Sequence, residues 1–253
     1  MSELVTYRYD EQGYGEITLN RPEKMNAISN EMTQSFSEAL NKAKQQSIKF
    51  LIITASGDRM FCAGGDLTDL HGDLDTEEAF SVLYPMKEVL YKIASFPVPV
   101  ICLLNGDARG GGCEIATACD FRIARSGTRF GFVQTKLGIT PGWGGGRLLY
   151  EKVASVFAFQ WLMEAKIYEA EYLRTKGWVH SIASEDEWKD RGILLKPYLA
   201  KSVEQMKVLK NQYLRQISIL PLSAQMDEEV RNCANLWETA EHKEAVKQFF
   251  SRK

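Results

Sequence analysis

The sequence has few of the residues that build metal centres or disulfide frameworks. Its 253 residues include five cysteines, an odd number, and three histidines. The cysteines occupy positions 62, 102, 113, 119 and 233, so none belongs to a Cys-x-x-Cys pair. We therefore expect reduced thiols, as in a cytosolic protein, and neither a metal site nor a redox cofactor. Cys113 has no histidine in its own motif, so we interpret it as a small buried apolar residue.

The sequence also lacks long apolar runs and a strong excess of one charge. No run approaches the roughly 18 apolar residues of a membrane-spanning helix. Residues 1–5 have neither the basic nor the apolar region of a signal peptide. The formal net charge of −2 provides no general attraction to nucleic acid or lipid. We expect a cytoplasmic protein without a nucleic-acid or membrane partner.

What the sequence does have is a glycine-rich segment between an apolar run and a helical run. Residues 98–104 predict a buried strand, and Gly110, Gly111 and Gly112 precede a helical pattern over 113–118. The first N–H groups of a helix have no internal partner, and glycine lets a ligand approach them closely. Glu114 follows Gly111 by three residues, so both can face one pocket. An amide donor beside a carboxylate suits enolate chemistry.

A second glycine pair follows another predicted strand. Residues 50–54 form an apolar run, and the segment 61–66, with sequence FCAGGD, lies a few residues beyond it. Glycines most often mark turns, so either segment alone is a weak signal. Together, the N–H groups of Gly65 and Gly111 would form an oxyanion hole, which needs two donors directed at one oxygen.

Two strands and a helix recur along the first two thirds of the chain. Strands are predicted over 4–9, 16–19, 50–54, 98–104, 121–124, 129–132 and 179–183, and helices over 31–44, 76–95, 113–118, 144–152 and 154–165. This order predicts an α/β protein of stacked ββα units. Helical patterns over 184–195, 203–216 and 223–250 then predict a separate helical region. The polar residues 67–75 predict a mobile loop.

Five segments resemble the crotonase (enoyl-CoA hydratase/isomerase) superfamily, and they occur in the family's order. They are LNRPEKMNA (19–27), FCAGGD (61–66), NGDARGGGCE (105–114), ACDFR (118–122) and LGITPGWGG (137–145). The resemblance implies a crotonase-type spiral over residues 1–195 that holds the catalytic site. It also implies a C-terminal helical region, residues 196–253, that packs at the interface of a homo-trimer or hexamer. The implied substrate is an acyl-CoA thioester, with coenzyme A as part of the substrate and no separate cofactor.

The resemblance also implies which residues act on the thioester. Gly65 and Gly111 match the oxyanion-hole donors, and Glu114 matches the first of two catalytic glutamates in hydratases. The second glutamate is missing, because the family pattern Phe-Gly-x-Pro-Glu is here Phe130-Gly-Phe-Val-Gln134. An amide cannot exchange a proton as a carboxylate does. The residues expected to border the substrate are Met25, Ala27, Ala63, Gly64, Asp66, Leu67, Gly110, Pro141, Gly142 and Trp143. Arg21 and Lys24 are candidate contacts for the phosphates.

The loop that contains Trp143 adds a second interpretation. Between Gly142 and Gly144, Trp143 is expected to wall the acyl pocket. The loop Gly138–Gly145 also resembles that of ethylmalonyl-CoA decarboxylase, whose reaction needs an oxyanion hole but no pair of carboxylates to activate water.

Three functional hypotheses follow. The first is an enoyl-CoA hydratase or isomerase with Glu114 as its acid–base group. The second is a decarboxylase of a malonyl-type CoA ester, such as methylmalonyl-CoA or ethylmalonyl-CoA. The third is a catalytically degenerate crotonase that serves as a scaffold or an RNA-binding subunit, which the intact glycine segments and the absence of a basic patch disfavour.

Overall fold

Two β-sheets form the centre of the protein. The computed structural model describes residues 3–70 and 74–251. A six-stranded sheet has the order β1-β2-β3-β5-β7-β10, and a four-stranded sheet has the order β4-β6-β8-β9. The first contains β1 (Val5–Asp10), β2 (Tyr14–Leu19), β3 (Leu51–Ala55), β5 (Val100–Leu104), β7 (Phe121–Arg125) and β10 (Ser181–Ala183). The second contains β4 (Met60–Cys62), β6 (Asp107–Arg109), β8 (Arg129–Gly131) and β9 (Tyr168–Glu169).

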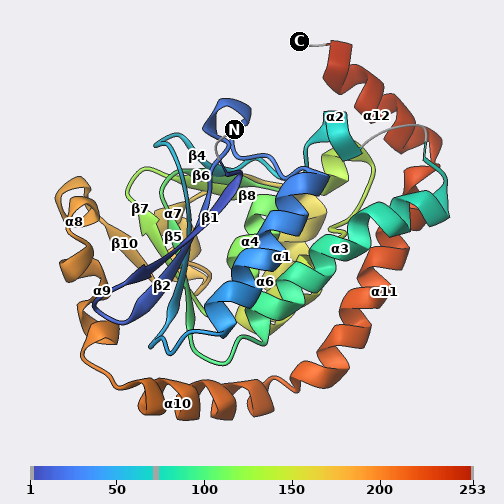
Figure 1. Ribbon diagram of the computed structural model, residues 1–253. Helices are drawn as coiled ribbons and strands as arrows, with labels where there is room; N and C mark the ends of the chain where they lie inside the picture. The colour runs from blue at the N-terminus through green and yellow to red at the C-terminus, as the bar shows by residue number, and fades with distance from the viewer. Residues whose placement is uncertain (1–2, 71–73, 252–253) are drawn as a thin grey trace.

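Consecutive strands alternate between the two sheets. After the antiparallel pair β1–β2, each of β3, β5 and β7 joins the large sheet in parallel, and the next strand, β4, β6 or β8, joins the small one. Helix α3 (Thr76–Ala94) follows β4, and α4 (Gly111–Ala118) follows β6. The chain therefore winds as a spiral of ββα turns, which confirms the predicted fold class (Figure 1).

Helices cover the sheets and account for most of the remaining chain. They are α1 (Asn30–Lys44), α2 (Leu67–Leu70), α5 (Gly145–Lys152), α6 (Ser155–Glu164), α7 (Ala170–Thr175), α8 (Glu185–Lys189), α9 (Arg191–Leu199), α10 (Val203–Gln216), α11 (Ile219–Trp237) and α12 (Ala240–Ser251), with short 3-10 turns at Pro22–Lys24 and Gln134–Leu137. Among the described residues, no helix is both long enough and apolar enough to cross a bilayer.

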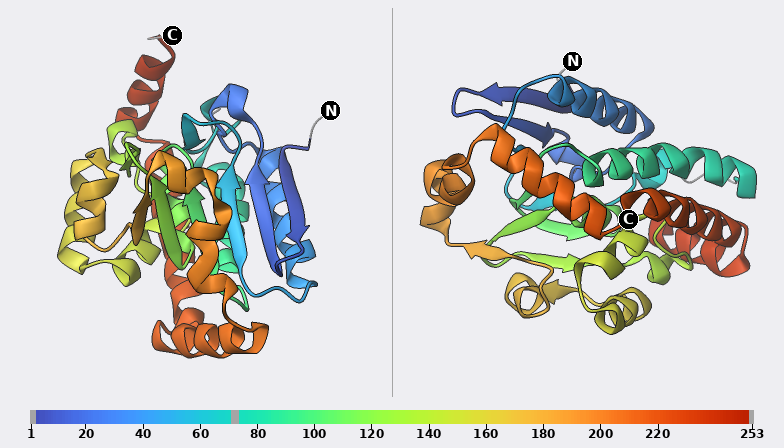
Figure 2. Two further views of the ribbon diagram at one scale, coloured as in Figure 1. Left: turned by 90° about the vertical axis from the view of Figure 1, so that its left-hand side faces the viewer. Right: turned by 90° about the horizontal axis from the view of Figure 1, so that it is seen from below.

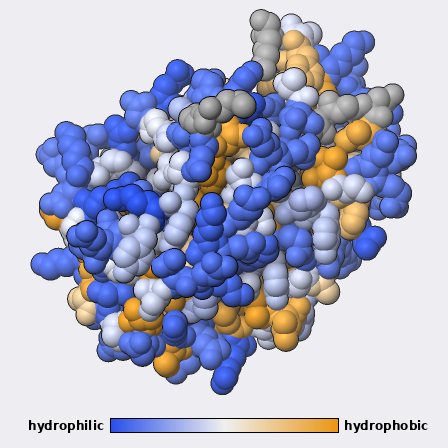
Figure 3. Space-filling view, viewed as in Figure 1, coloured by the Kyte–Doolittle hydropathy of each residue, from blue (hydrophilic) through white to orange (hydrophobic). Residues whose placement is uncertain are grey.

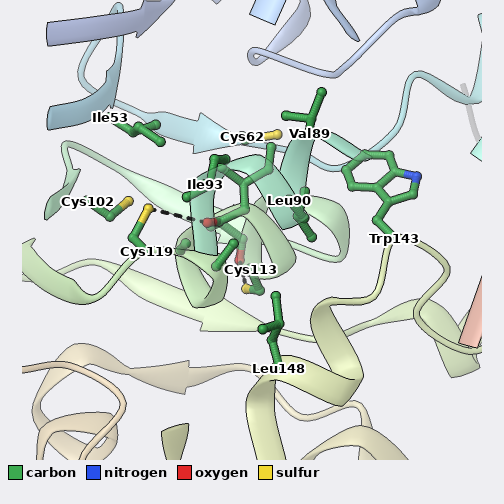
Figure 4. Close-up of a cluster of buried hydrophobic side chains, with 14 of the residues drawn as sticks. Ile53, Cys62, Val89, Leu90, Ile93, Cys102, Cys113, Cys119, Trp143 and Leu148 are labelled. Atoms are coloured by element: carbon green, nitrogen blue, oxygen red, sulfur yellow. Dashed lines mark hydrogen bonds between the residues drawn. The ribbon is translucent and has the colours of Figure 1, made fainter. Parts of the chain in front are cut away.

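Helix α4 lies in the middle of the hydrophobic core. All eight of its residues are buried, and Figure 4 shows Cys113 among side chains from β3, β5, α3 and α5. The Cys113 thiol donates to the carbonyl of Ala108 at 3.3 Å, and the five cysteines are free and buried. Burial raises the pKa of the Cys62 thiol to about 12, and it raises that of Cys113 as well. Both thiols therefore stay protonated, as expected of packing residues.

Several predicted elements differ from the structure. The helix expected over 184–195 is interrupted at Asp190, whose carboxylate accepts from the N–H groups of Gly192 and Ile193 and so begins α9. The helix expected over 223–250 is also two helices, α11 and α12, which are separated at residues 238–239. In the loop expected over 67–75, residues 67–70 form α2, and residues 71–73 lie outside the described ranges.

The C-terminal helices wrap around the spiral. Helix α11 packs along α3, where the buried ammonium of Lys87 contacts Asp227 at 2.5 Å. Helices α10 and α12 lie at opposite ends of the molecule (Figure 2). The domain boundary expected at residue 195 falls inside α9, and the helical region already begins after β10. The division into residues 1–195 and 196–253, and the role of the second part in assembly, remain predictions.

Candidate active site

A cavity of about 640 Å³ lies where the glycine segments meet the C-terminal helices. Thirteen of the fourteen predicted site residues line it: Met25, Ala27, Ala63, Gly64, Gly65, Asp66, Leu67, Gly110, Gly111, Glu114, Gln134, Gly142 and Trp143. The exception is Pro141, which is buried and whose ring packs against Gly146 at the start of α5. Pro141 is therefore the one predicted substrate contact that is not among the residues lining the cavity.

The two predicted amide donors come from loops that pack closely together. Gly65 pairs with Ile28 in a parallel bridge, in which Ile28 donates to Gly64 and Asp66 donates to Ile28, both at 2.8 Å. This pairing directs the Gly65 N–H away from Ile28. Gly111 is the first residue of α4, and its nitrogen would lie 3.3 Å from a Cβ on Gly64. Within the described residues neither N–H donates a hydrogen bond, so both remain open to a ligand.

Glu114 is held by three donors, two of which are backbone N–H groups at the start of helix α5. One carboxylate oxygen accepts from the N–H groups of Trp143 at 3.0 Å and Gly145 at 2.9 Å, and the other accepts from Nε2 of Gln134 at 2.9 Å. The side chain is buried, and its burial raises the pKa of the carboxyl, although the backbone and Gln134 bonds act in the opposite direction. A buried carboxyl with a raised pKa is suited to exchange protons near neutral pH.

Gln134 lines the cavity and has an unused hydrogen-bond acceptor in its side-chain amide. Its Nε2 is used by Glu114, and its Oε1 is buried without a hydrogen-bond partner among the described residues. Thr140 also lines the cavity, and its hydroxyl is likewise buried without a hydrogen-bond partner among the described residues. Buried polar atoms are normally satisfied, so both atoms mark positions where a bound ligand or water would form a hydrogen bond.

Trp143 packs against the first residue of α4. The side chain is 4% exposed, and a Cβ on Gly111 would lie 2.0 Å from Cζ3 of the indole. Glycine at position 111 is therefore required by this contact as well as by the open amide. The ring forms a wall beside the predicted oxyanion hole, in the position expected from the sequence.

Glu229 does not line the cavity, but it is a carboxylate close to Glu114 that sequence reasoning did not identify. Its carboxylate accepts from the N–H groups of Gly146, at 3.2 Å, and Arg147, the next donors after those that hold Glu114. Burial and then the charge of Glu114 raise the pKa of Glu229 well above its ordinary value. A signal was present, because Glu229 lies three residues after Met226 on the face of α11 that carries the buried residues.

The cavity also receives apolar side chains from the C-terminal helices. Cys233 and Trp237 contribute from α11, and Phe249 contributes from α12. These contacts depend on how the helices dock on the core, so no local sequence motif predicts that these residues line the cavity. Together with Leu83 and Val133 they give the inner cavity the apolar walls typical of a small-molecule site.

The loop at residues 21–27 forms the outer edge of the cavity. Met25 and Asn26 both have left-handed backbone angles, with φ near 54° and 52°. The Asn26 side chain fixes this turn by accepting from Arg21 N–H and donating to two carbonyls. Arg21 pairs with Asp66 at 2.6 Å, which lowers the pKa of that carboxyl, whereas exposed Lys24 lines the cavity. Lys24 is thus the better placed of the two predicted phosphate contacts.

Comparisons with known proteins identify the family of this chain. A model of the enoyl-CoA hydratase/isomerase family matches residues 10–253. Crotonyl-CoA hydratase of Syntrophomonas wolfei is 36% identical over 170 residues, which are 67% of this chain and 65% of that protein. Short-chain-enoyl-CoA hydratase of Clostridium acetobutylicum is 33% identical over 172 residues, which are 68% of this chain and 66% of that protein. The alignments thus span just under two thirds of these relatives.

The fold is shared with solved structures over almost the whole chain. A crystal structure of enoyl-CoA hydratase from Bacillus halodurans superposes with a TM-score of 0.87 at 24% identity, covering 97% of this chain and 99% of that one. The family match, the shared spiral and the glycine segments around one cavity lead to a single conclusion. The chain belongs to the enoyl-CoA hydratase/isomerase family, the crotonase superfamily.

Proposed function

We propose that this protein acts on an acyl-CoA thioester by stabilising its enolate, as an enzyme of the enoyl-CoA hydratase or isomerase type. The observation that carries the proposal is the open N–H pair of Gly65 and Gly111 beside the buried carboxylate of Glu114. Hydrogen bonds from the two amides to the thioester oxygen would strengthen as that oxygen becomes negative. Removing one such donor typically costs about 10²–10³-fold in rate.

Glu114 is the proposed acid–base group. Two other carboxylates line the cavity, but Glu23 is exposed and Asp66 is paired with Arg21, so Glu114 is the buried one. In this role Glu114 would move a proton between its Oε atoms and a carbon of the acyl chain. Gln134 would orient Glu114 and a water molecule without exchanging a proton itself. We expect modest hydration, because one carboxylate would perform the work of two.

Decarboxylation of a malonyl-type CoA ester is the second candidate. The observation in its favour is that the position expected for the second hydratase acid holds a neutral amide, and the hydroxyl of Thr140 lines the same cavity. Neutral hydrogen-bonding groups tolerate a substrate carboxylate that a second glutamate would repel. Loss of CO₂ leaves its electron pair on the α-carbon and generates the enolate directly, so the oxyanion hole would carry most of this reaction.

A panel of thioesters separates the candidates. Purified protein would be assayed for hydration of crotonyl-CoA, isomerisation of 3-hexenoyl-CoA and decarboxylation of methylmalonyl-CoA and ethylmalonyl-CoA. Turnover of the first two supports the hydratase or isomerase, and turnover of the last two supports the decarboxylase. Tight binding of CoA esters without any turnover would contradict both and favour the third reading, a scaffold.

We further propose a homo-trimer or hexamer in the cytoplasm. Apolar side chains at the spacing of one helical face, Val156, Phe159 and Met163, are more than half exposed on α6. Leu220, at the start of α11, is 76% exposed as well, and Figure 3 displays apolar patches on the molecular surface. Exposed apolar surface of this kind favours assembly. Light scattering that gives a monomer mass at micromolar concentration would contradict the oligomer.

A further inference from the structure

A second cavity, of about 530 Å³, lies at the other end of the molecule from the thioester cavity. The thioester cavity is lined by Leu67 of α2 and Phe249 of α12, whereas the second is lined by Met206 and Lys210 of α10. Figures 1 and 2 place α10 and α12 at opposite ends. The residues before β5 and β7, at the amino ends of these parallel strands, form the floor of the second cavity.

Two buried lysines share one carboxylate at this floor. Lys210 Nζ lies 2.6 Å from both oxygens of Asp120, and Lys152 Nζ lies 3.9 Å from the nearer oxygen. The side chains of Lys210, Lys152 and Asp120 are 1%, 5% and 6% exposed. Lys152 donates to the hydroxyl of Tyr213 at 2.9 Å, the one hydrogen bond of its ammonium to the described residues. An ammonium has three donors, so Lys152 retains capacity for an anion.

A third buried cation, the guanidinium of Arg122, adjoins the lysines and is bound by backbone carbonyls rather than by a carboxylate. The Arg122 guanidinium donates to the carbonyls of Trp178, Ala116 and Cys119. Nδ1 of His180 accepts a hydrogen bond from the backbone N–H of Arg122. Burial lowers the pKa of the His180 ring to about 3, so the ring is neutral. Glu151, which also lines the cavity, is engaged by Arg147 at 2.5 Å. Three buried cations therefore face the single negative charge of Asp120.

An excess of buried positive charge is costly unless an anion balances it. The same cost is evident at Lys152, because burial is the main cause that lowers the pKa of its ammonium to about 8, against the partial effect of Asp120. An oxyanion beside Lys152 would supply the missing charge and accept the unused N–H groups.

The walls of the cavity define the rest of the ligand. Above the cationic floor, Phe121, Pro197, Tyr198, Met206 and Leu209 supply apolar and aromatic surface. A bare inorganic ion would leave these walls in contact with water, whereas an organic anion would cover them. A cationic floor under apolar walls suits a ligand with one charged end.

We propose that this cavity is a second binding site, for a small organic carboxylate whose charged end contacts Lys152 and whose apolar part lies against Tyr198 and Leu209. The site is separate from the thioester cavity and does not depend on the proposed reaction. A short-chain carboxylic acid is the simplest ligand of this class.

Binding of hexanoate tests the proposal. Isothermal titration would be done on the intact protein with butyryl-CoA in excess, so that the thioester cavity is filled. We expect saturable binding of hexanoate, at least tenfold weaker binding of the neutral analogue hexanamide, and weak binding of inorganic phosphate. Absence of saturable hexanoate binding would overturn the proposal, and so would hexanamide or inorganic phosphate that binds as well as hexanoate.

Variants assign the binding to this cavity. We expect Lys152→Met to weaken hexanoate binding at least tenfold, and the exposed control Lys207→Met, on the outside of α10, to leave it unchanged. If Lys152→Met does not fold, Leu209→Trp fills the cavity from a wall residue that is 57% exposed, and it should abolish binding by itself. Thioester turnover should be unchanged in the control and in Leu209→Trp. Binding that survives in Lys152→Met or in Leu209→Trp contradicts the proposal.

Discussion

The side-chain amide of Gln134 donates a hydrogen bond to the carboxylate of Glu114, with 2.9 Å between Nε2 and Oε1. The position of Gln134 is the one at which the family's hydratases are expected to carry their second glutamate. Gln134 therefore offers Glu114 a neutral hydrogen-bond donor, and the pair has one titratable group. The chain thus shares the family's fold, but the fold alone does not determine which reaction this site performs.

Gln134→Glu is expected to increase hydration and to weaken the binding of malonyl-type esters. The new carboxylate would lie next to Glu114, so one of the two would hold a proton at neutral pH. General acid–base catalysis contributes about 10²–10⁴-fold, and we expect a gain of about tenfold or more in crotonyl-CoA hydration. The measurement is kcat/KM for hydration and the Kd for methylmalonyl-CoA in both proteins. Gln45→Glu, at the exposed end of α1, is the matched control. Unchanged hydration would show that position 134 is not used as an acid.

Glu114→Gln is expected to remove proton transfer while leaving ligand binding intact. The amide oxygen can still accept a hydrogen bond at the start of α5, but it cannot take a proton from carbon. Hydration or isomerisation should fall by about 10²–10⁴-fold. Calorimetry should give a Kd for butyryl-CoA within about threefold of the original, since the amides of Gly65 and Gly111 are unaltered. Retained turnover at near-normal rates would exclude Glu114 as the acid–base group.

Gly111 and Trp143 are expected to be energetically coupled. In Gly111→Ala the new Cβ would lie 2.0 Å from the indole, so the ring must move. We expect loss of stability and of turnover in Gly111→Ala, and a smaller additional loss of stability when Trp143→Ala is already present. Contacting residues typically show coupling of about 0.5–3 kcal/mol. Denaturant unfolding of the two single variants and the double variant measures this coupling. Strictly additive losses would mean that the ring does not pack on position 111.

The stability of Glu229→Gln is expected to depend on pH. The pKa of this carboxyl in the folded protein is raised well above its ordinary value near 4.5. A raised carboxyl pKa means that the folded state holds a proton that the unfolded state has lost. Glu229 therefore favours the folded state less as pH rises above about 4.5. The free energy of unfolding of Glu229→Gln, relative to the original protein, should therefore increase as pH rises from about 4.5 toward the raised pKa of Glu229 in the folded protein.

Glu228→Gln provides the control for this pH dependence. Glu228 is the exposed neighbour of Glu229 on α11, so its substitution should leave the pH dependence of unfolding unchanged. Denaturant unfolding at a series of pH values between 4 and 8 would compare the three proteins. An equal pH response in both variants would show that Glu229 does not carry this extra proton.

The apolar runs of β3 and β5 predicted two central strands of the large sheet, whereas the spiral itself was implied by the family resemblance. All five residues of β3 and of β5 are buried. By contrast, β4, β6 and β9 were not predicted, although β8 and β10, which are equally short, fall within the strands predicted over 129–132 and 179–183. The break at Asp190 was missed because the helical pattern continues across the capping residue.

The residues that line the cavity also fall into two groups, those within local sequence motifs and those brought there by tertiary packing. Residues within the glycine motifs were found because each motif is local in the chain. Trp237 and Phe249 were missed, because their approach to the cavity depends on how α11 and α12 dock on the core. Pro141 lies in a motif, but its ring packs against Gly146 of α5 and it does not line the cavity.

The most direct test of the central claim is exchange of the α-protons of butyryl-CoA in D₂O, followed by NMR. Formation of an enolate is sufficient for this exchange, whichever reaction is the natural one. We predict catalysed exchange by the original protein and its loss, by at least about 10²-fold, in Glu114→Gln. The absence of exchange in the original protein, or equal exchange in Glu114→Gln, would contradict an enolate mechanism with Glu114 as its acid–base group.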